Sequence, residues 1–360
     1  MNCWKIKMLT FLIMAGGSGE RFWPLSTKEN PKQLLHIFDE KSLLRLTYER
    51  ILPLTDNKHI FVATNKIQAK KVKEELKELD ASRIIIEPSF KDTASAICYG
   101  SLIISKYIDN PTIAVLASDH LIKDEDKFRM ILNIAEAKAN EGKIVTLGIK
   151  PTYPETGYGY IEAEDNKLNW PCKAISFKEK PNVDVAIEYI KKGNYLWNSG
   201  MFIFKRDVIM SEFKKYSPNH FETTVELDML IDKNNGIITA NKVQNKFNEY
   251  EKKSIDFAVM EKSDIIEVIP CEIGWNDVGG YLAFEELFQK DENGNVKRFV
   301  NCISLDSNNN IIVSENKNLQ RVALLDVSDM IIVVTKTDIL ILPKNRSQEI
   351  KKLIKIMPQD

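Results

Sequence analysis

Between residues 9 and 149, short apolar runs alternate with amphipathic stretches of helical spacing. The apolar runs predict strands at Leu9–Met14, His59–Thr64, Arg83–Glu87, Ile113–Ser118 and Ile144–Ile149. The stretches between them predict helices at Ser42–Ile51, Ile67–Leu79, from Asp92 or Thr93 to Tyr107, and Phe128–Ala139. Such alternation is typical of βαβ units. We therefore expect an α/β fold with a Rossmann-like, mostly parallel mixed sheet.

The composition and the pattern of apolar residues change after Lys150 and again near residue 289. Residues 151–288 carry aromatic and glycine-rich loops, strand-like runs at Ala174–Phe177 and Met201–Phe204, and amphipathic stretches at Val185–Ile190 and Phe247–Met260. Beyond them, short β runs separated by polar turns occur at Cys302–Leu305, Ile311–Val313, Val322–Leu325, Met330–Val334 and Ile339–Leu342, before a final helix at Ser347–Ile356. We predict one domain over 8–288, with an α/β part (8–150) and an elaboration of it (151–288). Residues 289–360 should form a small, solenoid-like β unit with a terminal helix.

Composition limits the possible partners and the cellular compartment. The net charge of -1 provides no general attraction for nucleic acid or an anionic membrane. Five scattered cysteines without a CxxC pair indicate reduced thiols rather than a disulfide framework or a zinc site. The apolar run that follows Lys5 and Lys7 resembles a short signal peptide, but we interpret it as the first strand, with residues 1–7 as an extension. No stretch approaches the ~20 apolar residues of a membrane span, so we expect a cytoplasmic protein.

A glycine-rich loop directly follows the first predicted strand. Its phosphate-binding candidates are Gly16, Gly17, Ser18 and Gly19, whose backbone N–H groups could approach phosphate oxygens closely. The loop has no GxxxxGK motif, and Phe22 and Pro24 do not fit a dinucleotide fingerprint. Arg21 and Lys32 could supply the positive charge that phosphate requires. The alternative is a tight turn with surface charges.

The residues around this loop also carry a family resemblance. The segment Gly16-Gly-Ser-Gly-Glu-Arg-Phe-Trp-Pro-Leu-Ser26, followed by Pro31-Lys32-Gln33, resembles the signature of bacterial mannose-1-phosphate guanylyltransferases. These enzymes belong to the sugar-nucleotidyltransferase superfamily, which shares the glycines, the Arg, the Pro-Leu and the Lys. The Phe-Trp pair is closer to the mannose branch. Further matches run to the C-terminus.

Two aspartates are candidate metal ligands. Asp119 ends a predicted strand, and Asp277 follows a later apolar run in the segment Trp275-Asn-Asp277-Val-Gly279. A lone Asp after a strand is more often a turn former or a helix cap. Two carboxylates, however, suit Mg²⁺, which usually takes one or two of them together with substrate phosphates. The resemblance implies that both hold the metal, and we expect His120 to be structural.

Glu87 is the candidate for base recognition. It ends a strand expected to flank the first one, and the resemblance places the base beside Glu87, Pro88 and Thr93. A carboxylate can accept both guanine N1–H and N2–H₂, whereas a Gln would suit thymine or uracil. The alternative is a solvated strand end. The sequence departs from the family nearby, where Lys91-Asp-Thr-Ala-Ser95 replaces the usual Arg-Asn-Thr-Ala-Pro.

The sugar-site candidates lie in four later motifs that match the family in order. They are Gly157, Tyr158 and Glu162, then Glu179 and Lys180, then Asn198, and finally Asp256. The resemblance implies that Glu179 and Asn198 bind hexose hydroxyls and that Lys180 holds the sugar phosphate. Asp256 is a possible sugar or metal contact. Taken one at a time, such charged residues are usually solvated.

The predicted reaction transfers GMP from GTP to mannose-1-phosphate, giving GDP-mannose and pyrophosphate. The attacking phosphate is mostly ionised at neutral pH, since its second pKa lies near ~6, so a general base is not required. Arg21, Lys32 and Lys180 should act on phosphate charge, and Mg²⁺ should assist in-line attack on the α-phosphate.

Other functions stay open. They are a thymidylyl- or uridylyltransferase acting on glucose-1-phosphate, a binding-only regulatory subunit and an NAD-dependent oxidoreductase. The partners we expect are small molecules and a second copy of the chain in a homodimer, with neither nucleic acid nor membrane. Some family members carry an extra isomerase domain; because this sequence ends at Asp360, we expect a single activity.

Overall fold

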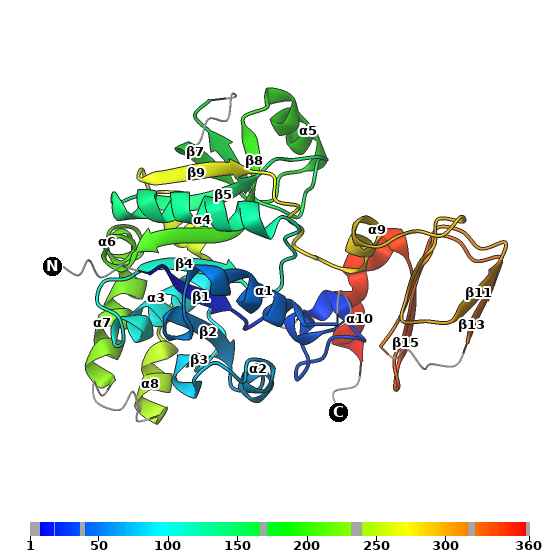
Figure 1. Cartoon of the computed structure of the whole chain (residues 1–360), viewed down its shortest axis with the longest axis horizontal. Helices are drawn as coiled ribbons and strands as arrows, with labels where there is room; N and C mark the ends of the chain where they lie inside the picture. Colours follow the sequence, from blue (N-terminus) through cyan, green and yellow to red (C-terminus); the bar gives the residue numbers. More distant parts are fainter. Residues whose placement is uncertain are drawn as a thin grey trace. The chain divides into compact units, whose positions relative to one another are not determined.

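A computed structural model describes residues 8–17, 19–36, 40–165, 171–231, 240–315 and 321–357 (Figure 1). The chain forms two compact units. The first unit comprises Met1–Gly16, Tyr48–Ser118 and Ile122–Trp275, and the second comprises Gly17–Thr47, Asp119–Leu121 and Asn276–Asp360. The polypeptide therefore passes from one unit to the other inside the glycine-rich loop.

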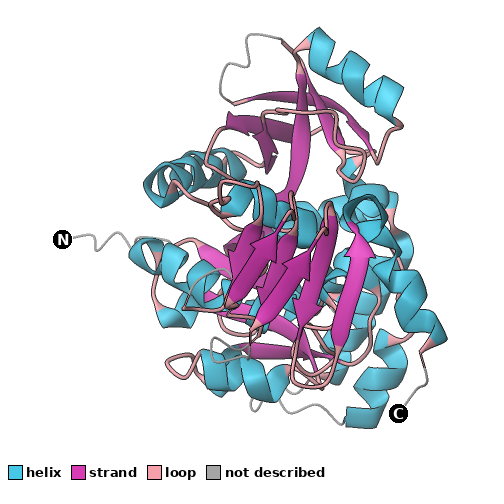
Figure 2. Ribbon diagram, turned by 90° about the vertical axis from the view of Figure 1, so that its right-hand side faces the viewer, coloured by secondary structure: helices cyan, strands magenta, loops and turns pink. Residues whose placement is uncertain are grey.

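The first unit is built on a nine-stranded sheet in the order β3-β2-β1-β4-β8-β5-β9-β7-β6. Figure 2 shows helices on either side of its strands. The strands are β1 (Thr10–Met14), β2 (Ile60–Asn65), β3 (Ile84–Glu87), β4 (Thr112–Ala117), β5 (Ile144–Ile149), β6 (Tyr160–Ala163), β7 (Cys172–Lys178), β8 (Tyr195–Lys205) and β9 (Ile266–Cys271).

The sheet is mixed, with a parallel part at one end. Strands β3, β2, β1 and β4 are parallel to one another, as are β5 and β9. Strand β8 runs antiparallel to β4, β5 and β6, and β7 runs antiparallel to β6 and β9. The expected parallel pairing is thus found for β3-β2-β1-β4 and for β5 with β9, and not for the pairs that involve β8 or β7. The difference arises because the long strand β8 enters between β4 and β5 in the reverse direction.

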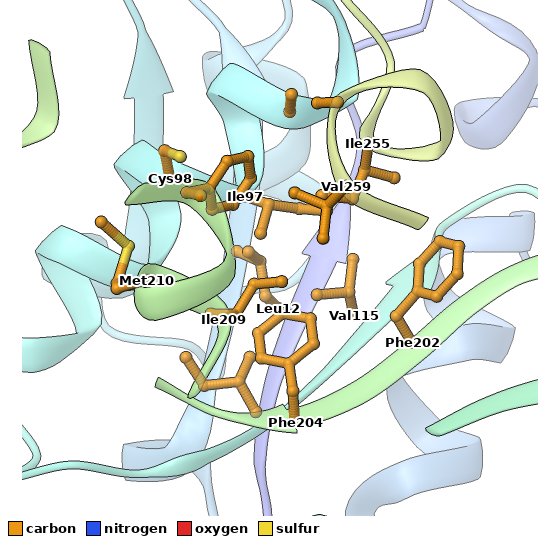
Figure 3. Close-up of a cluster of buried hydrophobic side chains, with 14 of the residues drawn as sticks. Leu12, Ile97, Cys98, Val115, Phe202, Phe204, Ile209, Met210, Ile255 and Val259 are labelled. Carbon is orange, nitrogen blue, oxygen red and sulfur yellow. The ribbon is translucent and has the colours of Figure 1, made fainter. Parts of the chain in front are cut away.

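The helices are α1 (Leu43–Ile51), α2 (Ala69–Glu75), α3 (Asp92–Ser105), α4 (Glu125–Asn140), α5 (Val183–Lys192), α6 (Arg206–Tyr216), α7 (Pro218–Leu230) and α8 (Ala240–Phe247). The main core joins strand residues such as Leu12 and Phe204 to Ile97 of α3 and Ile209 of α6. Figure 3 shows these side chains together with Ile255 and Val259. Ile255 directly precedes a π-helical turn, η6 (Asp256–Met260), and Val259 lies within it, so this turn belongs to the same core as α3.

Several predicted elements differ in extent from the observed ones. The predicted helix 67–79 is limited to α2, because Leu76 leaves helical dihedral angles. The predicted amphipathic stretch Phe247–Met260 is broken: α8 ends at Phe247, and η6 begins only at Asp256. The sequence analysis did not identify α6 or α7.

The second unit contains two small sheets near the C-terminus. One has the order β10 (Val296–Arg298), β12 (Ile311–Ser314), β14 (Met330–Val334) and β15 (Ile339–Pro343), and the other pairs β11 (Cys302–Leu305) with β13 (Val322–Leu325). All these pairs are parallel except β14 with β15. Two further helices are α9 (Phe284–Leu287) and α10 (Ile350–Ile356), the latter preceded by the 3-10 turn η8 (Lys344–Glu349). Successive coils thus stack in register, and the β runs predicted from the sequence are confirmed.

One apolar cluster holds the second unit together. It joins Phe22 and Leu25 of the glycine-rich region to Val278 and Tyr281 and to the inward side chains of the β coils, including Ile331. The Tyr281 hydroxyl donates to the carbonyl of Phe22 at 2.8 Å. None of the helices in the described part of the chain has both the length and the apolar character needed to cross a membrane.

Candidate active site

In the second unit, Lys32 lies beside both predicted metal ligands. Its Nζ is 2.9 Å from Asp119 Oδ2 and donates to the Asp277 carbonyl oxygen at 2.6 Å. Lys32 itself is buried, and its ammonium lies 6.0 Å from the centre of the Phe22 ring. Lys32 and Asp277, which are 245 positions apart in the sequence, are therefore in direct contact.

The pKa of Asp119 reflects this neighbourhood. Burial raises it, but the positive charges of Lys32 and His120 outweigh that effect and hold the pKa below its usual value. His120 Nε2 lies 3.9 Å from Asp119 Oδ1. Asp119 is therefore ready to act as an anionic oxygen ligand at neutral pH.

The donor set suits Mg²⁺ in this part of the site. Two carboxylates are hard oxygen ligands, and Mg²⁺ commonly completes its shell with water and substrate phosphates. The Asp277 carboxylate is fixed locally, since its Oδ1 accepts the Gly279 N–H at 3.0 Å. Among the residues that the structure describes, there is no group of three or more His, Cys, Asp or Glu side chains arranged for a metal.

The glycine-rich loop is held by contacts within the second unit. Gly19 has φ 63°, and a Cβ there would lie 2.6 Å from the Cβ of Lys32. Gly17 offers its carbonyl to Gln33 Nε2 at 3.2 Å. Arg21 donates to the Gly279 carbonyl at 3.4 Å, and Ser18 lies outside the described residues. Glycine is thus needed at position 19 both for its backbone conformation and for the close approach of Lys32.

In the first unit, Gly16 and Glu87 meet at the carboxyl ends of β1 and β3. A Cβ on Gly16 would lie 3.3 Å from Glu87 Oε1, and Asn65 Nδ2 donates to the Gly16 carbonyl at 3.5 Å. Removal from water raises the pKa of Glu87 to about 7. The predicted base-recognition carboxyl therefore titrates near neutrality.

The loop after Glu87 leads through Pro88 into α3. Asp92 has φ 72°, and its Oδ1 accepts the Thr93 N–H at 2.7 Å. The hydroxyl of Thr93 accepts the backbone N–H of Ile255 at 2.8 Å. Thr93, predicted as a nucleotide contact, is thus also tied to a distant segment of the chain.

Three of the predicted sugar-site residues lie together in the first unit. Asn198 Nδ2 donates to Asp256 Oδ1 at 2.8 Å, and a Cβ on Gly159 would lie 2.8 Å from Glu179 Oε2 and 3.4 Å from the Asn198 Cβ. Burial and the nearby charges of Glu179 and Glu261 raise the pKa of Asp256, against the lowering effect of the Asn198 hydrogen bond. Polar acceptors and an amide thus surround a backbone position that has no room for a side chain.

The other sugar-site candidates have different surroundings. Lys180, at φ 43°, places its exposed ammonium 2.5 Å from Glu179 Oε1. The Glu162 carboxylate accepts the Ser176 hydroxyl at 2.8 Å and contacts Tyr195, so its partners here are not Asn198 or Glu179.

Gly157 and Tyr158 are held by other loop residues. The Gly157 N–H donates to Glu155 Oε1 at 2.6 Å. Tyr158 packs edge-on against Trp197 and Trp275, with ring centres 5.3 and 5.4 Å apart. These contacts fix the shape of the loop that precedes Gly159.

Three residues with close approaches in the structure, Gly159, Gln33 and Gly279, were not predicted as site residues. Each has a visible signal: Gly159 lies within the Thr156–Glu162 motif, Gln33 follows Lys32, and Gly279 follows Asp277 by two positions. Their importance depends on close approaches between segments far apart in the sequence, which spacing alone does not give.

Comparison with known proteins decides the family. Residues 10–294 match the nucleotidyl transferase family, and residues 300–357 match a family described as a MannoseP isomerase/GMP-like beta-helix domain. The chain belongs to the nucleotidyl transferase family. It has the corresponding fold of mixed sheet and helices, followed by a β-helix domain.

Relatives of this nucleotidyl transferase are similar over nearly its whole length. The mannose-1-phosphate guanylyltransferase of Klebsiella pneumoniae is 35% identical, over 98% of this chain and 74% of the relative. The mannose-1-phosphate guanylyltransferase RfbM of Salmonella typhimurium is 36% identical, over 95% of this chain and 71% of the relative.

A solved structure agrees with these relatives. It bears the name mannose-1-phosphate geranyltransferase, from Thermus thermophilus, and aligns with a TM-score of 0.86 at 32% identity, covering 97% of this chain and 98% of that one. The resemblance to bacterial mannose-1-phosphate guanylyltransferases predicted from the glycine-rich loop is therefore confirmed.

Proposed function

We propose that this nucleotidyl transferase transfers GMP from GTP to mannose-1-phosphate, releasing pyrophosphate and forming GDP-mannose. The observation that carries the proposal is the contact of Lys32 with both Asp119 and the backbone of Asp277. A buried cation beside the Asp119 carboxylate and the Asp277 backbone is suited to a triphosphate and its metal, and the relatives are named for this reaction.

In the proposed mechanism the chain's residues align anions and neutralise their charge. Lys180 holds the attacking sugar phosphate, and Arg21 and Lys32 stabilise the charge of the departing pyrophosphate. Asp119 and Asp277 would hold Mg²⁺, which when bound withdraws charge from the phosphate oxygens. The backbone N–H groups of Gly16, Gly17, Ser18 and Gly19 are assigned to the triphosphate.

Base and sugar selection are assigned to the first unit. As a carboxylate, Glu87 accepts guanine N1–H and N2–H₂, with Pro88 and Thr93 beside the base. Glu179, Asn198 and Asp256 bind the hexose hydroxyls, with Gly157, Tyr158 and Glu162 shaping the loop before Gly159. The Asn198–Asp256 hydrogen bond supports this assignment, because it orients an amide and a carboxylate together.

The wider organisation follows from the same proposal. The parallel strands β3-β2-β1-β4 serve as the Rossmann-like nucleotide-binding half, within a transferase region at 8–288, and the stacked coils of 289–360 form a short solenoid. We further propose that the enzyme works as a homodimer in the cytoplasm.

The direct test measures pyrophosphate release. The protein is incubated with Mg²⁺, one of GTP, ATP, dTTP or UTP, and either mannose-1-phosphate or glucose-1-phosphate. Release that depends on GTP together with mannose-1-phosphate is expected. Equal release with every triphosphate would contradict the assignment to Glu87, and no release with any pair would indicate a binding-only protein.

A further inference from the structure

The loop that follows Glu87 is fastened to a segment that starts after α8. Ser89 Oγ donates to Asn248 Oδ1 at 2.7 Å, and Lys91 Nζ donates to the Asn248 carbonyl at 2.6 Å. Nearer the helix, the Ala94 N–H donates to the Lys253 carbonyl at 3.2 Å. The start of α3 and the segment 248–255 thus form one hydrogen-bonded structure.

Thr93 makes the last of these contacts, immediately before Asp256. Its hydroxyl oxygen accepts the Ile255 N–H at 2.8 Å, across 162 residues of sequence. Ile255 is buried, and it belongs to the same hydrophobic core as Ile97 of α3, as Figure 3 shows. The backbone of Ile255 is therefore held by Thr93 while its side chain is held by the core.

Asp256, the next residue, begins η6 and accepts Asn198 Nδ2. The first backbone N–H groups of a helical turn have no partner within the turn. Their orientation therefore depends on hydrogen bonds to other segments of the chain. The hydrogen bond from Ile255 to Thr93 is such a partner, one residue away from the carboxylate that contacts Asn198.

We infer that Thr93 is a positioning residue for the sugar site, because its hydroxyl fixes the backbone that presents Asp256 to Asn198. The inference rests on the proposed function, in which Asp256 and Asn198 bind the hexose. It gives Thr93 a role toward the sugar although the residue lies in the first turn of α3, which follows the loop assigned to the base. Recognition of the base and recognition of the sugar would then both depend on the hydrogen bond between Thr93 and Ile255.

The test separates this role from a nucleotide contact. Thr93→Val keeps the shape of the side chain but removes the acceptor for Ile255, and a neutral hydrogen bond of this kind corresponds to a roughly three- to tenfold change in affinity. We expect the KM for mannose-1-phosphate to rise by that factor at saturating GTP, and to rise more than the KM for GTP. Thr93→Ser, which retains the hydroxyl, should restore wild-type values.

A double-mutant cycle with Asp256→Ala shows whether Thr93 acts through Asp256. If it does, Thr93→Val lowers kcat/KM for mannose-1-phosphate in the wild-type background but hardly at all in Asp256→Ala. Thr337→Val, at an exposed turn, is the matched control, and Thr93→Ala is the second test if valine disturbs the start of α3. Melting curves followed by circular dichroism establish that each variant is folded.

Three results would overturn the inference. They are a rise in the KM for GTP with the sugar KM unchanged, additive effects in the double variant, and failure of Thr93→Ser to rescue. Absence of turnover by the wild-type protein would instead reject the proposed function, and the inference with it. Failure of the proposed function would be seen in the wild-type protein itself, whereas failure of the inference alone would be seen only in the variants.

Discussion

The pKa of Glu87 predicts a pH dependence in GTP binding. With that pKa raised to about 7 by removal from water, the free enzyme loses its carboxylate as the pH falls below neutrality. A protonated carboxyl cannot accept both guanine N–H groups, so we expect the KM for GTP to rise by roughly tenfold for each pH unit below 7. Steady-state kinetics between about pH 5.5 and about pH 8.5 would measure it, with pH values chosen on the basis of that pKa.

Glu87→Gln is the control for this effect, because its side chain does not titrate. It should weaken GTP binding at about pH 8 and lose the pH dependence assigned to residue 87. The folded state also holds the extra proton of Glu87 where the unfolded chain does not, so the free energy of unfolding should fall as pH rises from about 4.5 to about 7. If Glu87→Gln kept the pH dependence of both the KM for GTP and the free energy of unfolding, another group would be responsible for the titration.

Lys32 predicts opposite effects on metal affinity and on turnover. Its ammonium contacts Asp119 Oδ2, so without substrate it competes with a cation for that oxygen. Lys32→Met should raise the affinity of the nucleotide-free protein for Mn²⁺ several-fold, measured by electron paramagnetic resonance. The same variant should lower kcat by on the order of 10²-fold, because a charge on the departing pyrophosphate is lost.

Lys28→Met removes an exposed lysine from the same region and serves as the matched control. It should change neither the Mn²⁺ affinity nor kcat. Unchanged or weaker Mn²⁺ binding in Lys32→Met would mean that Lys32 does not compete with the metal at Asp119.

At the scale of elements, the sequence pattern predicted those helices and strands whose bounds depend on neighbouring residues. The strand at Ile144–Ile149 was predicted with its observed bounds, because six consecutive apolar or small residues fit a buried strand. The break between Phe247 and Asp256 was missed because it depends on hydrogen bonds to the loop before α3 and to the first turn of that helix. Likewise, the sequence suggested both Asp119 and Lys32 as site residues but could not show that they touch.

Gly148 on β5 tests how tightly the sheet is packed. A Cβ there would lie 2.6 Å from Leu196 Cδ1 on β8 and 2.7 Å from Val268 Cγ2 on β9. Gly148→Ala should therefore lower the free energy of unfolding by about 1–3 kcal/mol, measured by urea denaturation. In the double variant with Leu196→Ala the alanine fills part of the vacated space, so the combined destabilisation should be smaller than the sum of the two single effects. Full additivity would place the strain elsewhere.

At the scale of the whole molecule, each of the two compact units combines segments that lie far apart in the sequence. Lys32, Asp119 and Asp277 all belong to the second unit, in which Phe22 and the β coils share one apolar cluster. Composition shifts along the chain could not reveal this, because it results from packing between residues 17–47 and residues beyond 276. The C-terminal coils therefore stabilise the loop that carries the proposed catalytic cations.

A substitution at Ile331 in β14 tests whether the coils stabilise this loop. It is buried in this cluster, so Ile331→Ala should lower the stability of the second unit by about 2–5 kcal/mol. In this variant, proteolysis should begin to cut the β coils at a lower temperature than in the wild-type protein. Because the Lys32 region shares the cluster, pyrophosphate release should be lost at that same temperature. Ile356→Ala, which alters a side chain that is 79% exposed, should change neither temperature. Activity that outlasted cleavage of the coils would show that the catalytic loop folds independently of them.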